Sequence, residues 1–132
     1  MNLALTDETL AKLTQVQEKM LTLPQEDVHT EHFFHAGMYV RTVTIGREVV
    51  LMGALIKIPT LLIVSGKTKV FTGDGWIELQ GYNVIPAKAG RKQIFVGMEE
   101  THITMIFHTN AETLEQAEEE FTGEYEALVT RR

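Results

Sequence analysis

The segment KTKVFTGDGWIELQ, residues 67–80, decides the fold class because it can form a β-hairpin with a single consistent register. If residues 72–75 form the loop, the facing side chains match in chemical type. The pairs are aromatic with aromatic, aliphatic with aliphatic and cation with anion: Phe71 with Trp76, Val70 with Ile77, and Lys69 with Glu78. Such cross-strand pairs stabilise antiparallel strands. The segment therefore predicts antiparallel β-structure.

The chain from about residue 33 to residue 108 has the same character as this hairpin. Short β-branched and aromatic runs alternate with turns, many of which contain glycine, as in MYVRTVTI, EVVLMG, LIKI, TLLIVS and HITMIF. So many short strands predict an antiparallel sandwich or barrel, in which LIKI is also a strand. We expect the whole chain, residues 1–132, to form one mainly β domain.

A helix is predicted at each end of the strand region. The first spans about residues 6–22, with Thr6 as its N-cap and apolar residues at helical spacing. The second spans about residues 110–121 and is capped by Asn110. We interpret its glutamate run, residues 118–120, as a solvated helix face.

The composition excludes several classes of function. The net charge of −6 and the lack of long basic runs argue against nucleic acid as a partner. Without cysteine, the 132-residue chain has no disulfide and no thiolate chemistry. Its apolar runs are too short to span a bilayer, and its N-terminus differs from a signal peptide. We therefore expect a cytoplasmic protein.

The run GYNVIPAKAGRKQIFVGMEETHITMIF, residues 81–107, with the SG turn before it, resembles the small cupins. The flanking segments 31–45 and 107–121 are similar to cupin-like proteins of phages and prophages. The resemblance covers roughly residues 30–122. It implies a jelly-roll barrel that encloses a site near one mouth, in a protein of phage origin located in the bacterial cytoplasm or in a virion.

The resemblance also implies where metal ligands would lie, because many cupins bind one metal ion through two histidines and a glutamate of a first motif and a histidine of a second. The second motif is retained as Gly81, Pro86 and Gly90, although three residues separate the last two where the family usually has one. The position of its histidine corresponds to Gln93, the glutamate position to Pro59, and the other histidine positions to residues 52–55. These residues are poor ligands for a divalent metal. We therefore expect neither a metal nor another cofactor.

Two basic residues inside apolar strands suggest a site. Arg41 and Lys57 must each face water or meet a partner. They lie either on a solvent-facing side of the sheet or in a pocket at the barrel mouth, together with Tyr39, Gln93 and His102. The period of two residues places Tyr39 on the same strand face as Arg41. Such a pocket would bind a small polar or anionic molecule.

The histidines leave other readings open. His29, His32 and His35 have a spacing that suggests metal binding, but we interpret their segment as a loop with surface or capping roles. In a metal-free cupin enzyme, a sugar or sugar-nucleotide isomerase or epimerase, His102 or His35 would be the base. The acid would be Tyr39 or Tyr82.

Three functions therefore stay open: a metal-free cupin-like binding or assembly module, such an enzyme, and a structural virion or interaction protein. We favour the binding module. We also expect a homodimer, because cupin-like barrels commonly pair. In addition, EVVLMGALIKI, residues 48–58, is apolar on both faces when read as strands.

Overall fold

The computed structural model describes residues 7–20, 28–73 and 75–128, and these form one curled antiparallel sheet with two α-helices. The elements are α1 (Asp7–Met20), β1 (His29–His35), β2 (Met38–Ile45), β3 (Val50–Met52), β4 (Thr60–Phe71), β5 (Trp76–Ala87), β6 (Ile94–Gly97), β7 (Thr101–His108), α2 (Leu114–Phe121) and the 3-10 helix Tyr125–Ala127. The strand region thus begins at residue 29 rather than at residue 33. The proposed cap Thr6 lies outside the described residues.

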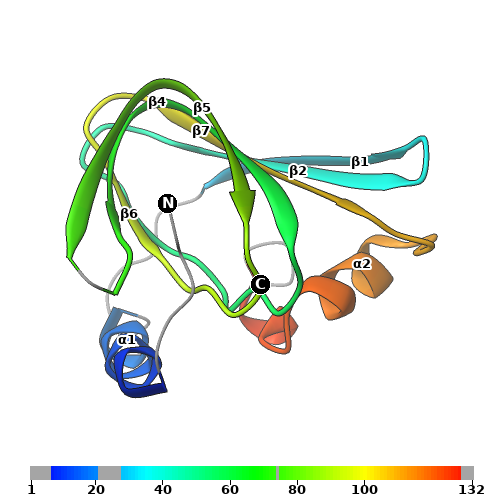
Figure 1. Cartoon of the computed structure of the whole chain (residues 1–132), viewed down its shortest axis with the longest axis horizontal. Helices are drawn as coiled ribbons and strands as arrows, with labels where there is room; N and C mark the ends of the chain where they lie inside the picture. The colour runs from blue at the N-terminus through cyan, green and yellow to red at the C-terminus, as the bar shows by residue number, and fades with distance from the viewer. Residues whose placement is uncertain (1–6, 21–27, 74, 129–132) are drawn as a thin grey trace.

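The seven strands form a half-barrel. Their order is β1-β2-β7-β4-β6-β3, and β5 pairs with the remaining edge of β4. Figure 1 shows the sheet as an arch, with both helices on its open, concave side. The predicted mainly β fold of antiparallel strands, with a short helix at each end, is confirmed. Within the described part, no helix is long and apolar enough to cross a membrane.

The predicted hairpin is present with the expected register. Phe71 pairs with Trp76, and their ring centroids lie 5.4 Å apart. The loop is closed by a hydrogen bond from the Thr72 amide to the Gly75 carbonyl. This local pattern was sufficient because each pair is close in sequence.

Strand β4 changes partner along one edge. Residues 61–65 pair with β7, and residues 68–71 pair with β6. Gly66 lies between the two ladders with a φ of 140°, and a Cβ atom there would lie 2.5 Å from the carbonyl oxygen of Glu100. Only glycine fits this crossing without displacing backbone.

The expectation for residues 48–58 was wrong in part. Only Val50–Met52 forms a strand, and LIKI belongs to a connection, residues 53–59, which we call the strap. Among the described residues the strap has one isolated β-bridge, between Ile56 and Arg91, and the Gly53 amide also donates to the Gln93 carbonyl. Gly53 and Pro59 bound the strap, and both residue types disfavour a strand interior.

The core lies on the concave side of the sheet in two clusters. The larger includes Ile45, Val64, Val70 and Phe95. The smaller packs α2 against β2 and β7, and we call it the α2 cluster; its buried members are Tyr39, Met105, Phe107, Ala117 and Phe121. Ile56 and Ile58 of the strap also pack on the α2 cluster. The strap and α2 therefore close one end of the half-barrel.

The start of α2 differs from the prediction. Thr113, not Asn110, is the N-cap, and its hydroxyl accepts a hydrogen bond from the Gln116 amide at 3.2 Å. Threonine satisfies one of the free amides of the first turn in this way. The helix begins at Leu114, four residues later than expected, and this shift determines which glutamates face the sheet.

Candidate functional site

The concave face of β2 carries Tyr39 and Arg41 into the closed end of the half-barrel. Arg41 is only 6% exposed, so the solvent-facing reading is wrong for this residue. Its Nη1 donates to the Tyr39 hydroxyl at 3.2 Å and lies 3.4 Å from Glu118 Oε2. The guanidinium also stands 5.5 Å from the centroid of the Phe121 ring, as in a cation–π contact.

Glu118 is the residue that the sequence interpretation missed. It is fully buried, whereas we expected a solvated glutamate. Its position three residues before Phe121 puts both on the same side of α2, which packs on the sheet. The available signal was Arg41 itself, because a buried guanidinium requires a buried carboxylate or an equivalent partner.

Burial also affects the tyrosine. It raises the pKa of the Tyr39 hydroxyl above 10.0, and the nearby Arg41 charge and hydrogen bond oppose part of that rise. The hydroxyl is therefore neutral at ordinary pH. At this end of the fold a neutral phenol, a guanidinium and a carboxylate lie in contact, surrounded by aromatic side chains.

Gln93 lies just before β6, at the entrance to the strand. It is 5% exposed, and the alternation of β6 places it on the face of Phe95, which belongs to the larger core cluster. Its backbone carbonyl accepts from the Gly53 amide at 2.9 Å. Its side-chain Nε2 is buried and has no hydrogen-bond partner. This donor is directed into the protein without an acceptor.

The two residues before Gln93 are also buried. Lys92 donates to both carboxylate oxygens of Glu124 at 2.7 and 2.8 Å. Arg91 donates to the Lys88 carbonyl at 2.9 Å and to the hydroxyl of Thr60. Burial lowers the pKa of Arg91 to about 10, so it keeps its charge at neutral pH. These side chains join the strap, the 88–93 segment and the C-terminal turn.

His102 and Lys57 lie elsewhere. His102 is on the convex face of β7, its side chain is 49% exposed, and its Nδ1 is 2.9 Å from the Thr44 hydroxyl. Lys57 is exposed on the strap. The predicted residues thus do not share one concavity: Tyr39 and Arg41 meet, and among the described residues no hydrogen bond or ion pair joins Gln93 to either. His102 is on the opposite face because residues 102 and 103 alternate.

The residues proposed for an enzyme are also separated. Tyr82 is 70% exposed, and Ser65 of β4 lies between it and His102 in the strand register. His35 ends β1 on the surface. In the described part of the chain, no hydrogen bond joins a histidine to a tyrosine. Among the described residues there is therefore no assembled acid–base pair of the kind that this alternative requires.

The donor set does not fit a divalent metal. His29, His32 and His35 lie in strand β1 rather than in a loop, so His32 faces away from the other two. Among the residues described, no three His, Asp or Glu side chains come together in a way that could hold a metal ion. The positions that the cupin resemblance equates with ligands carry Gln93, Pro59 and residues 52–55.

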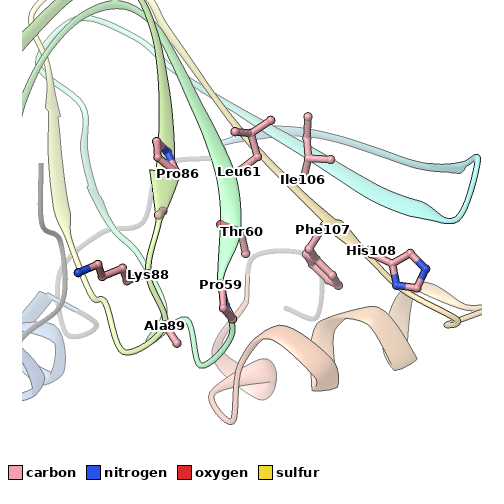
Figure 2. Close-up of a pocket in the computed structure, with 10 residues that line it drawn as sticks. Pro59, Thr60, Leu61, Pro86, Lys88, Ala89, Ile106, Phe107 and His108 are labelled. Carbon is pink, nitrogen blue, oxygen red and sulfur yellow. The ribbon is translucent and has the colours of Figure 1, made fainter.

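A groove of about 610 Å³ crosses the rim of the sheet. It is lined by residues 59–61 at the start of β4, residues 86–89 at the end of β5, and residues 106–108 at the end of β7. Figure 2 shows Thr60 near its middle, with Lys88 and His108 toward opposite ends. The lining is mostly apolar, and the groove is open to solvent.

No protein-family model and no curated protein matches the chain. A cupin superfamily protein from Desulfitobacterium hafniense is similar in structure, with a TM-score of 0.53 at 13% identity over 67% of this chain and 83% of that one. The chain has a cupin-like fold. A cupin 2 conserved barrel domain protein from Salinispora arenicola has a TM-score of 0.51 at 9% identity, covering 68% of this chain and 84% of that one. The EutQ protein of Clostridium difficile has a TM-score of 0.52 at 12% identity, covering 71% and 73%. At such identities the likeness concerns the fold alone.

Proposed function

We propose that this cupin-like chain is a binding module that holds a small polar molecule on the concave side of its half-barrel, without a metal ion. The observation that carries the proposal is the buried, unpartnered Nε2 of Gln93. Buried donors in native proteins nearly always have an acceptor. A carbonyl or hydroxyl oxygen of a ligand would supply it, and the amide would orient that ligand through both a donor and an acceptor.

The charges nearby favour a polar ligand over a strongly anionic one. Arg41 is already paired with Glu118, and Lys92 with Glu124. Neither of these two cations needs a further counter-ion, and the third buried cation, Arg91, donates to the Lys88 carbonyl and to Thr60. The paired charges therefore favour a neutral polar ligand, and the uncharged Gln93 amide favours the same kind of ligand.

The test is mass spectrometry of small molecules that copurify with the protein. Wild-type protein should carry a compound that Gln93→Leu protein lacks, because leucine keeps the volume and removes the amide. Gln80→Leu, an exposed glutamine on β5, is the matched control and should retain the compound. If the three proteins copurify with the same compounds, the ligand-binding role of Gln93 is wrong.

The metal-free part of the proposal has its own measurement. Elemental analysis of protein purified without a histidine tag should give far less than one equivalent of any divalent metal. The reason is the lack of ligand types at the expected positions. Stoichiometric zinc, iron, manganese or nickel would overturn it.

We further propose that the chain forms a homodimer through the β1–β2 hairpin, which lies at one end of the strand order of the described sheet (Figure 1). This hairpin carries the exposed apolar side chains Phe33, Phe34 and Met38, and Phe33 is 56% exposed. Large apolar side chains that are exposed to this extent are commonly buried by a partner. The hairpin is also an edge of the described sheet, where β1 pairs with β2 alone.

Light scattering at micromolar concentration tests the dimer. The wild type should have twice the monomer mass, and Phe33→Lys should shift it to the monomer mass. Val50→Lys, which places the same charge at an exposed apolar position on β3, should leave the dimer intact. A monomeric wild type would refute the proposal.

From the sequence resemblance we also propose a phage or prophage origin, with the protein in the bacterial cytoplasm or in a virion. Phage genes around its coding sequence would agree with this.

The enzyme alternative requires His102 or His35 to act as a base together with a tyrosine acid, although these side chains lie apart. Exchange of substrate protons with solvent, measured on sugar nucleotides, should therefore be absent.

A further inference from the structure

The rim groove has a buried cation directly behind its lining. Arg91 is 1% exposed, and its guanidinium donates to the Thr60 hydroxyl and the Lys88 carbonyl, both of which belong to lining residues. No ion pair among the described residues includes Arg91. Its Nε has no hydrogen-bond partner. A buried guanidinium without a carboxylate is costly, and an anion at this place would lower that cost.

Thr60 connects this charge to the groove. Its hydroxyl oxygen accepts a hydrogen bond from Arg91, and no hydrogen bond of the described residues uses its proton. A hydroxyl can donate while it accepts. Figure 2 places Thr60 between the β5 and β7 sides of the groove. The free proton is therefore available to an acceptor in the groove and is polarised by the cation behind it.

The rest of the lining selects the body of the ligand. Ala87 and Phe107 line the groove on the same sheet face as Thr60, whereas Leu61 and Ile106 pair with each other and point to the opposite face. The guanidinium itself lies behind the lining, so it cannot offer its planar fork to the several oxygens of a phosphate. One hydroxyl donor, one screened positive charge and apolar walls suit a single carboxylate on an apolar chain or ring.

We propose that this groove binds a small organic monocarboxylate, whose carboxylate accepts a hydrogen bond from the Thr60 hydroxyl opposite Arg91 and whose apolar body lies against Ala87 and Phe107. The groove crosses the sheet rim and does not include Gln93, so the proposal goes beyond the polar site proposed above. The chain carries a net charge of −6, and binding thus depends on this local positive charge and not on the overall field.

Arg91 also has a structural role, because its backbone pairs with Ile56 and its side chain joins the strap to the 88–91 turn. Substituting Arg91 would therefore confuse binding with folding. Thr60→Val separates the two, because valine keeps the shape and removes only the hydroxyl. Thr42→Val removes a hydroxyl from the convex face, outside the groove, and is the matched control.

The experiment is a titration followed by backbone amide chemical shifts, with sodium hexanoate, sodium benzoate, hexanamide and inorganic phosphate as probes. Hexanoate or benzoate should shift the amides of residues 60–61, 87–89 and 106–108 and saturate with a dissociation constant in the millimolar range, which is typical of so small a ligand. Hexanamide should bind about tenfold more weakly or worse, because it lacks the charge. Phosphate should not saturate the groove.

Thr60→Val should weaken carboxylate binding by about tenfold or more, the usual effect of losing a hydrogen bond to a charged group. Thr42→Val should bind as the wild type does. Equal affinity in Thr60→Val and wild type, equal affinity for amide and carboxylate, or no saturable shift at the groove would each overturn the proposal. The Gln93→Leu protein should retain carboxylate binding, which separates a failure here from a failure of the concave site.

Discussion

Glu118, Glu119 and Glu120 are chemically identical neighbours, yet they occupy three different environments. Glu118 is buried against Arg41, Glu119 is exposed, and Glu120 accepts a hydrogen bond from Thr109 at 2.6 Å. The rotation of α2 about its axis decides among them, and Thr113 sets where that helix begins. The sequence predicted the helix and not its rotation, so the site partner of Arg41 could not be predicted from the run of glutamates.

We expect Glu118→Gln to lower the free energy of unfolding by about 3 to 5 kcal/mol, because it leaves the Arg41 charge buried without compensation. Urea unfolding followed by tryptophan fluorescence measures the change. Glu112→Gln, the same substitution at an exposed position before α2, should change stability by less than about 0.5 kcal/mol. A loss as small as that for Glu118→Gln would show that the ion pair is not needed for stability.

Titration of the Tyr39 hydroxyl makes the free energy of unfolding decrease at alkaline pH. Its pKa is raised above 10.0 by burial, so the folded protein holds the proton more tightly than the unfolded chain does. This contribution is fully present below pH 10.0 and is lost as the pH rises through the higher folded pKa. Arg91 acts with the opposite sign, because burial lowers its pKa to about 10 and stability therefore rises as the pH increases above that value.

The effect of Tyr39 is isolated by comparing the wild type with Tyr39→Phe. The stability of the wild type should fall relative to that of Tyr39→Phe as the pH is raised above about 10. Chemical unfolding at a series of alkaline pH values gives this difference. A constant difference between the two proteins would mean that the hydroxyl titrates normally.

Among the elements, the hairpin of β4 and β5 and the strap show what local sequence does and does not determine. The hairpin register was predicted because its pairs lie within a few residues of one another and match in type. The strap was predicted as a strand because LIKI is mostly apolar and contains two β-branched isoleucines. It is instead held by contacts with Arg91 and Phe121, which are distant in sequence. No local pattern contains that information.

Strand β4 depends on the glycine at its crossing point. We expect Gly66→Ala to cost roughly 2 to 6 kcal/mol, since the new Cβ would meet the Glu100 carbonyl oxygen and the residue would keep a positive φ. Thermal unfolding reports the loss.

Gly81→Ala is the control for strain alone. Gly81 also has a positive φ but has open space around its Cβ position, so the cost should be about 1 to 2 kcal/mol. Equal costs at the two positions would mean that the contact with Glu100 is relieved by a backbone shift.

For the whole molecule, the half-barrel predicts a gradient of protection from hydrogen exchange. β4 is bonded on both edges, whereas in the described sheet β5 and β1 are each bonded to one strand. Amides of residues 61–65 and 68–71 should therefore exchange most slowly, and outward-pointing amides of β5 fastest. Amide exchange followed by mass spectrometry tests this. Strong protection along the free edge of β5 would show that another chain covers it.

The whole fold was easier to predict than the site. The alternation of short β-branched and aromatic runs with turns, together with a cupin resemblance, was enough for the fold class, because both features extend over much of the chain. Tyr39 and Arg41 were placed together correctly by the two-residue period of a strand. Whether Lys57 and His102 face solvent was left open by the sequence. Lys57 lies on the strap, which is not a strand, and for His102 alternation gives a relative face and not which face is concave.

The pairing of Arg41 with Glu118 has a consequence for the order of events during folding. The two side chains are 77 residues apart in the chain, so their contact closes one of the longest loops in the molecule. A growing chain that has completed β2 must keep the Arg41 guanidinium hydrated until α2 has been synthesised and docked. Loops of this length close slowly. The concave side of the sheet therefore stays hydrated at one end until α2 docks, and that docking is the step that expels the water.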